Sequence, residues 1–285
     1  MTNLRQQMIE AMQQRGFAKP THESYLRAVT DLARYTHRAP DLLTIDDIKD
    51  YAGYLVRERA LSSASCHLYL SGIRFLYLQV LDWPSFNVSI PLPKRPQRIP
   101  ELLTRTEVAR IITACRNDKH QMMLLTCYGC GLRVNELVAI KVRHLDGERR
   151  LLRVEQGKGN KDRMVTLPDQ LLRRLRQYWQ IYHPGHWLFP SSALFPNTHL
   201  CASSIQRVFN ACKRKAGIEK IGGIHGLRHA YATYSLEAGI PVNQLQHLLG
   251  HQNINSTLRY LHWLPRCNAQ ETTECDLIAS LEDVS

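Results

Sequence analysis

Seven residues in two distant parts of the chain have side chains whose chemistry suits a phosphodiester. They are Arg133 and Glu136 in G-L-R-V-N-E, His225, Arg228 and His229 in H-G-L-R-H, His251 in L-G-H, and Tyr260 in S-T-L-R-Y. In-line attack on a phosphodiester spreads negative charge over the non-bridging oxygens. A guanidinium stabilises that charge with its own positive charge and two aligned hydrogen-bond donors. Either arginine alone fits a surface ion pair. The two together, with their flanking motifs, predict a site that breaks a phosphodiester, where each preorganised donor typically contributes about 3 to 4 kcal/mol.

A glycine-containing turn supplies a candidate lysine. The residues Q-G-K-G-N-K at 156–161 lie between alternating apolar segments, which predicts a β-hairpin over about 151–167. Lys158 stands between the two glycines, and Lys161 is its rival within the same turn. An ammonium there can protonate a leaving 5′ oxygen, so the turn offers two candidates for a general acid.

Together these segments resemble the tyrosine recombinase (phage integrase) family. Its pattern is an Arg, a Lys on a β-hairpin, H-x-x-R, a second His and a nucleophilic Tyr, and all six positions are filled here. The resemblance implies that Tyr260 attacks a DNA phosphate and forms a 3′-phosphotyrosyl link, with no metal and no cofactor. The family motif places its lysine between the two glycines, so the resemblance assigns the general-acid role to Lys158 and not to Lys161. No G-x-x-x-x-G-K-[ST] nucleotide loop is present, which agrees with chemistry that conserves bond energy.

The resemblance also implies roles for the histidines and for Glu136. His225 would serve the phosphate and proton transfer, and His251 would donate to a non-bridging oxygen. His229 would be a buried, hydrogen-bonded partner. Glu136 is an accessory residue or a plain helix-surface ion pair with Arg133, three positions earlier. The cationic neighbours are expected to lower the pKa of the Tyr260 phenol.

Composition agrees with a polyanionic partner. Lysine and arginine number 37 against 25 aspartates and glutamates, for a net charge of +12 and a pI near 9.5. The first residues have apolar side chains at helical spacing, unlike a signal peptide. No apolar stretch is long enough for a membrane helix. We therefore expect a soluble, cytoplasmic, nucleoid-associated protein with no membrane contact, whose eight cysteines are reduced.

Two patterns raise metal binding as an alternative. His225 and His229, and likewise His247 and His251, are four residues apart, a spacing that lets one helix hold zinc. No H-E-x-x-H is present, no carboxylate accompanies either pair, and both pairs lie inside the recombinase motifs. Cys127 and Cys130 form C-Y-G-C without a second C-x-x-C. We expect core packing for the cysteines and no metal.

The N-terminal residues 1–88 predict a small unit of four helices. Leu4–Met12 is the first, and Thr21 can cap the second. Thr44 with Asp47 resembles a capping box for the third, and Ser62 or Ser63 can begin a fourth that ends at Trp83-Pro84. The following stretch, 89–100, has four prolines, which predicts an extended domain boundary. Its basic residues suit either a strap along DNA phosphates or a solvated linker. They are Lys94, Arg95 and Arg98.

Residues 101–285 form the expected catalytic domain. A capping box at Thr104 to Glu107 begins a helix, two helices follow at 120–128 and 134–140, and more are expected after the hairpin. Those later helices span 168–181, 203–215, 226–237 and 241–249, with Gly239 and Gly250 as stop signals. The tail after Pro265 has an apolar cluster that docks on a neighbouring protomer, folds back or frays.

We therefore expect a mainly α protein with one small β-sheet, made of a helical core-binding domain and an α+β tyrosine-recombinase catalytic domain. The resemblance implies a site-specific recombinase that acts as a homotetramer on paired sites in double-stranded DNA, and that is monomeric or weakly associated when free. A DNA-binding protein without activity is an alternative from another class. Relaxation of the type IB topoisomerase kind shares the chemistry and would not pair two sites.

Overall fold

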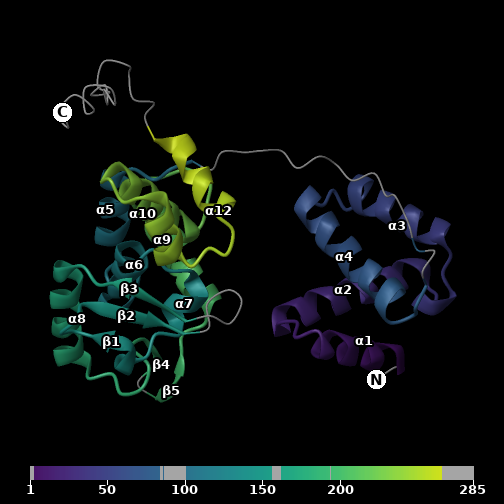
Figure 1. Ribbon diagram of the computed structural model, residues 1–285, viewed down its shortest axis with the longest axis horizontal. Helices are drawn as coiled ribbons and strands as arrows, with labels where there is room; N and C mark the ends of the chain where they lie inside the picture. The colour runs from purple at the N-terminus through teal and green to yellow at the C-terminus, as the bar shows by residue number, and fades with distance from the viewer. Residues whose placement is uncertain (1–2, 84–85, 87–100, 156–161, 193, 265–285) are drawn as a thin grey trace, which may run out of the picture. The chain divides into compact units, whose positions relative to one another are not determined.

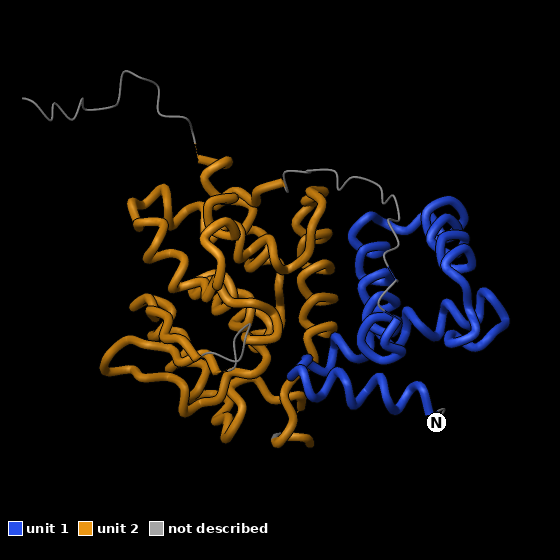
Figure 2. The backbone as a smooth tube through the Cα atoms, turned by 45° about the vertical axis from the view of Figure 1, so that its right-hand side comes forward, with its two compact units in different colours: residues 1–98 blue, residues 99–285 orange. Residues whose placement is uncertain are grey.

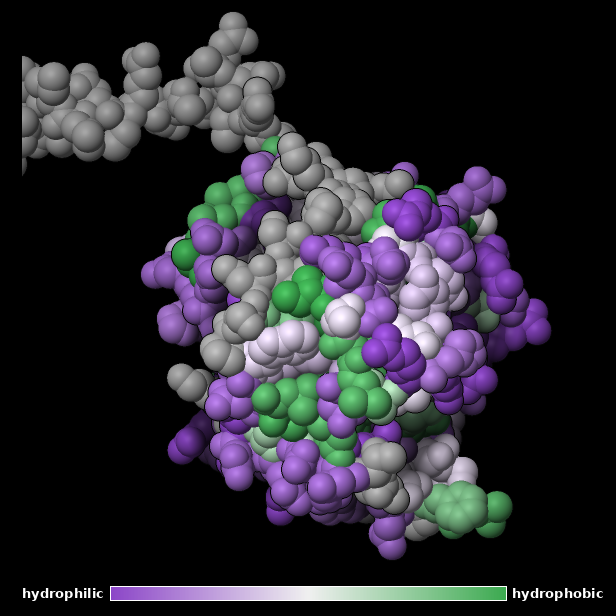
Figure 3. All heavy atoms as spheres, turned by 90° about the vertical axis from the view of Figure 1, so that its right-hand side faces the viewer, coloured by the Kyte–Doolittle hydropathy of each residue, from purple (hydrophilic) through white to green (hydrophobic). Residues whose placement is uncertain are grey.

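The structure is a computed structural model in which residues 3–83, 86, 101–155, 162–192 and 194–264 are described. The chain divides into two compact units, 1–98 and 99–285 (Figure 2). Among the described residues, no helix is both long and apolar enough to cross a membrane. Figure 3 shows one face, on which hydrophobic residues (green) form patches among hydrophilic ones (purple).

Unit 1 is helical throughout its described part (Figure 1). Its elements are α1 (Asn3–Gln14), α2 (Lys19–Thr36), the short 3-10 helix η1 (Pro40–Leu42), α3 (Ile45–Arg57) and α4 (Ser63–Gln79). Met8, Leu32, Ile48 and Tyr77 are among the side chains fully buried in its core. The expectation of four helices is confirmed.

Local signals placed two of these helix starts correctly and one incorrectly. Thr44 and Asp47 form a complete capping box, and the Ser62 hydroxyl accepts from the backbone N–H of Ser65. Thr21 does not cap α2, because the helix already begins at Lys19 with Pro20 in its first turn, where a missing N–H costs nothing. The fourth helix likewise ends at Gln79, before the Trp83-Pro84 pair.

Unit 2 packs helices around two small antiparallel sheets (Figure 1). Its helices are α5 (Arg105–Thr113), α6 (Asp118–Gly129), α7 (Val134–Val138), η2 (Val142–His144), α8 (Asp169–Tyr182), α9 (Ala202–Lys215), α10 (His225–Glu237), α11 (Val242–Leu249), α12 (Asn255–Leu258) and η3 (Arg259–Trp263). Its strands are β1 (Leu145–Asp146), β2 (Leu151–Val154), β3 (Arg163–Thr166), β4 (Pro190–Ser192) and β5 (Phe195–His199).

The expectation of a single sheet was wrong. The hairpin is present, with β2 paired to β3 from Leu151–Thr166 to Val154–Arg163, but β1 adds a third strand and β4 with β5 makes a second sheet. β4 and β5 are short and rich in proline and serine, residues that indicate a loop. The capping box at Thr104 and Glu107 is confirmed.

Candidate active site

Arg133 stands at the start of α7, and Glu136 is the third residue of that helix. One Glu136 oxygen, Oε2, accepts from the backbone N–H of Arg133 at 2.8 Å. The other, Oε1, accepts from the Arg133 guanidinium at 2.8 Å. Glu136 is only 8% exposed, so this is a buried contact and not the helix-surface pair that sequence left open. The carboxylate therefore holds both the backbone N–H and the guanidinium of Arg133.

A second arginine, which the sequence analysis did not single out, holds the same carboxylate. Arg163, the first residue of β3, donates from Nη1 and Nη2 to the two oxygens of Glu136, each at 2.8 Å. Burial by itself would raise the pKa of Glu136, but the hydrogen bonds and charges of Arg163 and Arg133 outweigh it and lower that pKa to about 2. Glu136 is thus ionised throughout the neutral range.

Arg228 lies on α10 and is 1% exposed. Its guanidinium donates to the carbonyls of Gly131 at 2.7 Å and Leu249 at 2.6 Å, and to Nε2 of His251 at 3.1 Å. Burial and then the charge of Arg133 lower the pKa of Arg228 to about 10. The group is still cationic at neutral pH, and it sits 3.8 Å from Glu136.

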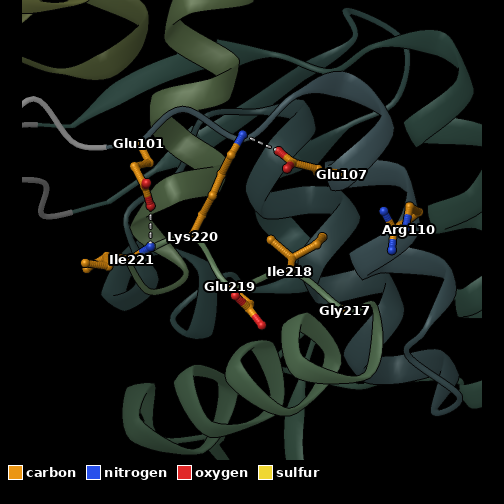
Figure 4. A pocket seen from close by; sticks show the side chains of 8 residues that line it. All are labelled: Glu101, Glu107, Arg110, Gly217, Ile218, Glu219, Lys220 and Ile221. Atoms are coloured by element: carbon orange, nitrogen blue, oxygen red, sulfur yellow. Dashed lines mark hydrogen bonds and ion pairs between the residues drawn. The ribbon is translucent and has the colours of Figure 1, made fainter.

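His225 begins α10 and is exposed, and His229 follows one turn later. Their rings meet edge to face with centroids 5.4 Å apart. The loop before α10 is held by Lys220, which donates to Glu107 at 2.7 Å (Figure 4). Lys220 also donates to the Leu102 carbonyl at 2.7 Å. This clamp anchors the segment from which α10 starts.

His251 follows Gly250, which ends α11 in the left-handed conformation at φ 62°. Because Nε2 accepts from Arg228, Nδ1 carries the proton and donates to the Thr257 hydroxyl at 2.8 Å. Burial, followed by the charges of Arg228 and other arginines, lowers the pKa of His251 to about 3. The imidazole is therefore neutral near pH 7.

Tyr260 lies in η3 and is 3% exposed. Its hydroxyl is 3.3 Å from Nδ1 of His229, and its ring stacks on His251 with centroids 6.2 Å apart. Burial raises the pKa of the phenol, while Arg228, through charge and a hydrogen bond, and Arg259 act in the opposite direction. The expected net lowering of the Tyr260 pKa was wrong, because desolvation outweighs the arginines.

The structure brings Arg133, Arg228, His251 and Tyr260 into one connected network, with His229 on the phenol. Five residues named from sequence lie outside the described residues: Lys94, Arg95, Arg98, Lys158 and Lys161. Arg163 was missed because a single arginine at a strand end has no sequence signal that separates it from a surface residue.

One histidine of each pair, His229 and His251, has a different partner in this network. Both ring nitrogens of His251 are hydrogen-bonded, and His247 is exposed. Among the described residues, no group of three or more His, Cys, Asp or Glu side chains is placed to hold a metal ion. Cys127 and Cys130 are buried, and burial raises the pKa of each thiol to about 12, which agrees with core packing.

The chain belongs to the phage integrase family: the family model matches residues 101–266, and the model of the N-terminal SAM-like domain of phage integrases matches residues 4–85. The protein y4qK of Sinorhizobium fredii is 42% identical over 267 residues, which cover 92% of this chain and 84% of that protein. A tyrosine recombinase of Pseudothermotoga lettingae is 32% identical over 223 residues, 75% of this chain and 76% of its own.

Solved structures agree in fold. The crystal structure of the XerA recombinase aligns over 92% of this chain and 94% of its own with 27% identity and a TM-score of 0.54. A lambda integrase tetramer bound to a Holliday junction aligns over 90% of this chain and 76% of its own, with 18% identity and a TM-score of 0.73. The chain is thus a tyrosine-type site-specific recombinase, an enzyme that cleaves and rejoins DNA.

Proposed function

We propose that Tyr260 is the nucleophile of this recombinase and that Arg133 and Arg228 hold the scissile phosphate. The observation that carries this proposal is the placement of the phenol beside the Arg228–His251 pair, with the Tyr260 ring stacked on His251 and the charge of Arg228 acting to lower the pKa of the phenol. The phenol oxygen attacks phosphorus, the bond from phosphorus to the 5′ oxygen breaks, and a 3′-phosphotyrosyl link forms. The freed 5′ hydroxyl of another strand reverses the step.

The proton of the phenol must leave during attack, because burial keeps the phenol protonated at neutral pH. His229 orients the hydroxyl through its contact at 3.3 Å. His225, exposed at the first turn of α10, takes the role of contacting the phosphate and accepting the proton. His251 has a single ring proton. Once phosphate displaces Arg228, that proton is carried on Nε2 and donated to a non-bridging oxygen, while Nδ1 accepts from the Thr257 hydroxyl.

The leaving 5′ oxygen also needs a proton, and we assign its delivery to Lys158. This assignment rests on the match of the turn to the family pattern. Lys161 in the same turn, with Lys94, Arg95 and Arg98, is assigned to DNA phosphates on the basis of charge. All five lie outside the described residues.

Unit 1 offers a described cationic surface for the duplex. A hollow of about 510 Å³ is lined by four arginines and two carboxylates. These are Arg5, Arg27, Arg34, Arg59, Glu23 and Asp31. Asp31 pairs with Arg59 at 3.3 Å and with Arg34 at 3.6 Å, which leaves an excess of positive charge. We infer that this surface binds DNA backbone, as phosphate contacts position a protein without reading sequence.

We further propose that four protomers pair two sites, since the lambda integrase structure named above is a tetramer on a Holliday junction. Free protein is expected to be monomeric or weakly associated. The division of the chain into a DNA-binding domain at 1–88, a linker at 89–100 and a catalytic domain at 101–285 is part of the same proposal.

Covalent trapping tests the mechanism. Duplexes that bind the full-length protein would be selected from a random library, and the selected site would be made as a nicked suicide duplex. Wild type should form an adduct that resists SDS, and Tyr260→Phe should form none. Tyr182→Phe, which changes a tyrosine that is 48% exposed, is the matched control and should react like wild type.

An absence of adduct from wild type on every selected site would favour a DNA-binding protein without activity. If the adduct forms, a plasmid with two selected sites separates the remaining alternatives. Exchange between the sites supports recombination by paired protomers. Relaxation of supercoils without exchange would instead support topoisomerase-like action.

A further inference from the structure

The C-terminus of α11 is surrounded by arginines. The last carbonyls of a helix have no partner within the helix, and they carry its partial negative charge. Here three consecutive carbonyls, at 248, 249 and 250, each accept from a different guanidinium. The donors are Arg163 Nε at 2.9 Å, Arg228 Nη2 at 2.6 Å and Arg133 Nη2 at 3.2 Å. They come from β3, from α10 and from the residue before α7.

Glu136 is a second acceptor that these arginines share. Arg163 binds it with both terminal nitrogens, and Arg133 binds it with one guanidinium nitrogen and its backbone N–H. The side chain of Arg163 is 10% exposed and that of Arg133 is 22% exposed. Arg163 and Arg133 therefore contact the same two groups, which are Glu136 and the end of α11. Arg163 does so from a more buried position.

Arg163 also packs directly on the backbone next to His251. A Cβ atom built at Gly250 would lie 2.9 Å from Cδ of Arg163 and 3.1 Å from its Nε. The guanidinium thus leaves no space between β3 and the end of α11. This contact fixes the peptide that precedes His251 in the chain.

We propose that Arg163 is a positioning residue for DNA cleavage, which holds Glu136 and the end of α11 so that Arg133 stays available to the scissile phosphate. The inference rests on the proposed function of Tyr260 and the two arginines. Each Glu136 oxygen now accepts from Arg163 and from one donor of Arg133. Without Arg163, each buried Glu136 oxygen loses one donor. The carboxylate then competes with the scissile phosphate for the guanidinium of Arg133.

The test is single-turnover adduct formation by the full-length chain on the selected suicide duplex. Arg163→Gln should slow adduct formation at least tenfold, with unchanged affinity for the duplex. Arg163→Lys keeps the charge but cannot bind both Glu136 oxygens and the Leu248 carbonyl together. Its rate of adduct formation should therefore lie between those of wild type and Arg163→Gln. The matched control is Arg153→Gln on the neighbouring strand, whose partner is Asp162 and which is 54% exposed. It should stay within twofold of wild type.

A second substrate separates positioning from general stability. In a duplex with a methylphosphonate at the scissile position, a methyl group replaces one non-bridging oxygen, so the linkage carries no charge and depends less on the charge of the arginines. The defect of Arg163→Gln should shrink at least threefold on this duplex. An equal defect on both substrates, or a loss explained by weaker DNA binding, would overturn the proposal.

A double variant provides a readout for the route through Glu136. If Arg163 acts through that carboxylate, Arg163→Gln combined with Glu136→Gln should be no slower than the slower single variant. If the rate loss of the double variant equals the product of the two single losses, Arg163 does not act through Glu136. Should wild type form no Tyr260-dependent adduct, the proposed function itself fails. An adduct in wild type with an unimpaired Arg163→Gln refutes only the positioning role.

Discussion

Replacing Glu136 with glutamine should destabilise unit 2 strongly and in a pH-dependent way. The carboxylate is 8% exposed, and its pKa falls from 4.5 to about 2 in the folded chain. Each pKa unit corresponds to about 1.36 kcal/mol, so the ionised carboxylate contributes about 3 kcal/mol to the free energy of unfolding at pH 7. Glutamine keeps the shape, removes the charge and leaves Arg133 and Arg163 without their counter-ion.

The sign of the pH dependence follows from the direction of the shift. A carboxyl group whose pKa is lower in the folded state stabilises fully above the unfolded pKa, and this contribution is lost as the pH falls through the folded pKa. The gap between wild type and Glu136→Gln should therefore be about 3 kcal/mol at pH 7 and about 1.4 kcal/mol at pH 3. For a unit of this size, the larger gap lowers the melting temperature by about 6 to 12 °C.

Scanning calorimetry of the full-length chain at pH 7, 4 and 3 measures this gap. Glu148→Gln, at an exposed position of the same unit, is the matched control and should change the free energy by less than about 0.5 kcal/mol. A loss below about 1 kcal/mol at pH 7, or a loss of equal size at pH 3, would refute the account of Glu136 as the buried counter-ion of the arginines.

Three further substitutions probe other parts of the structure. Gly131→Ala places a Cβ at φ 58° and 2.3 Å from the Tyr231 ring; it should cost more than about 2 kcal/mol of unfolding free energy in urea titration, while Gly185→Ala, with no atom within 4 Å, should be neutral. His251→Gln should reduce the loss of folding stability that wild type shows in acid. Because the pKa of His251 falls from 6.5 to about 3 on folding, wild type loses stability as pH drops from 6.5 towards 3, and the melting temperature of the variant should fall less over that window; parallel curves would contradict this. Thr44→Ala removes the capping box of α3 and should cost about 1 kcal/mol in unit 1 without changing the rate of adduct formation; an altered rate would show that the cap serves more than unit 1.

Features encoded by a few neighbouring residues could be predicted from sequence. The capping boxes at Thr44 and Thr104 were predicted correctly, because a cap and its partner lie three residues apart and act through their own backbone. The hairpin of β2 and β3 followed from alternating apolar residues. The set of family residues was visible for the same reason, since each motif is contiguous.

What joins those motifs was decided by tertiary structure. Arg163 and Glu136 are 27 residues apart, and no local pattern states that a strand end and a helix start will share a buried carboxylate. The direction of the pKa shift of Tyr260 also depended on tertiary structure. The arginines were visible in the sequence, but the burial that outweighs them was not. Sequence thus identified the groups that we propose for contact with a phosphate. Packing alone determined their solvent exposure and their partners, since desolvation and long-range hydrogen bonds depend on the whole fold.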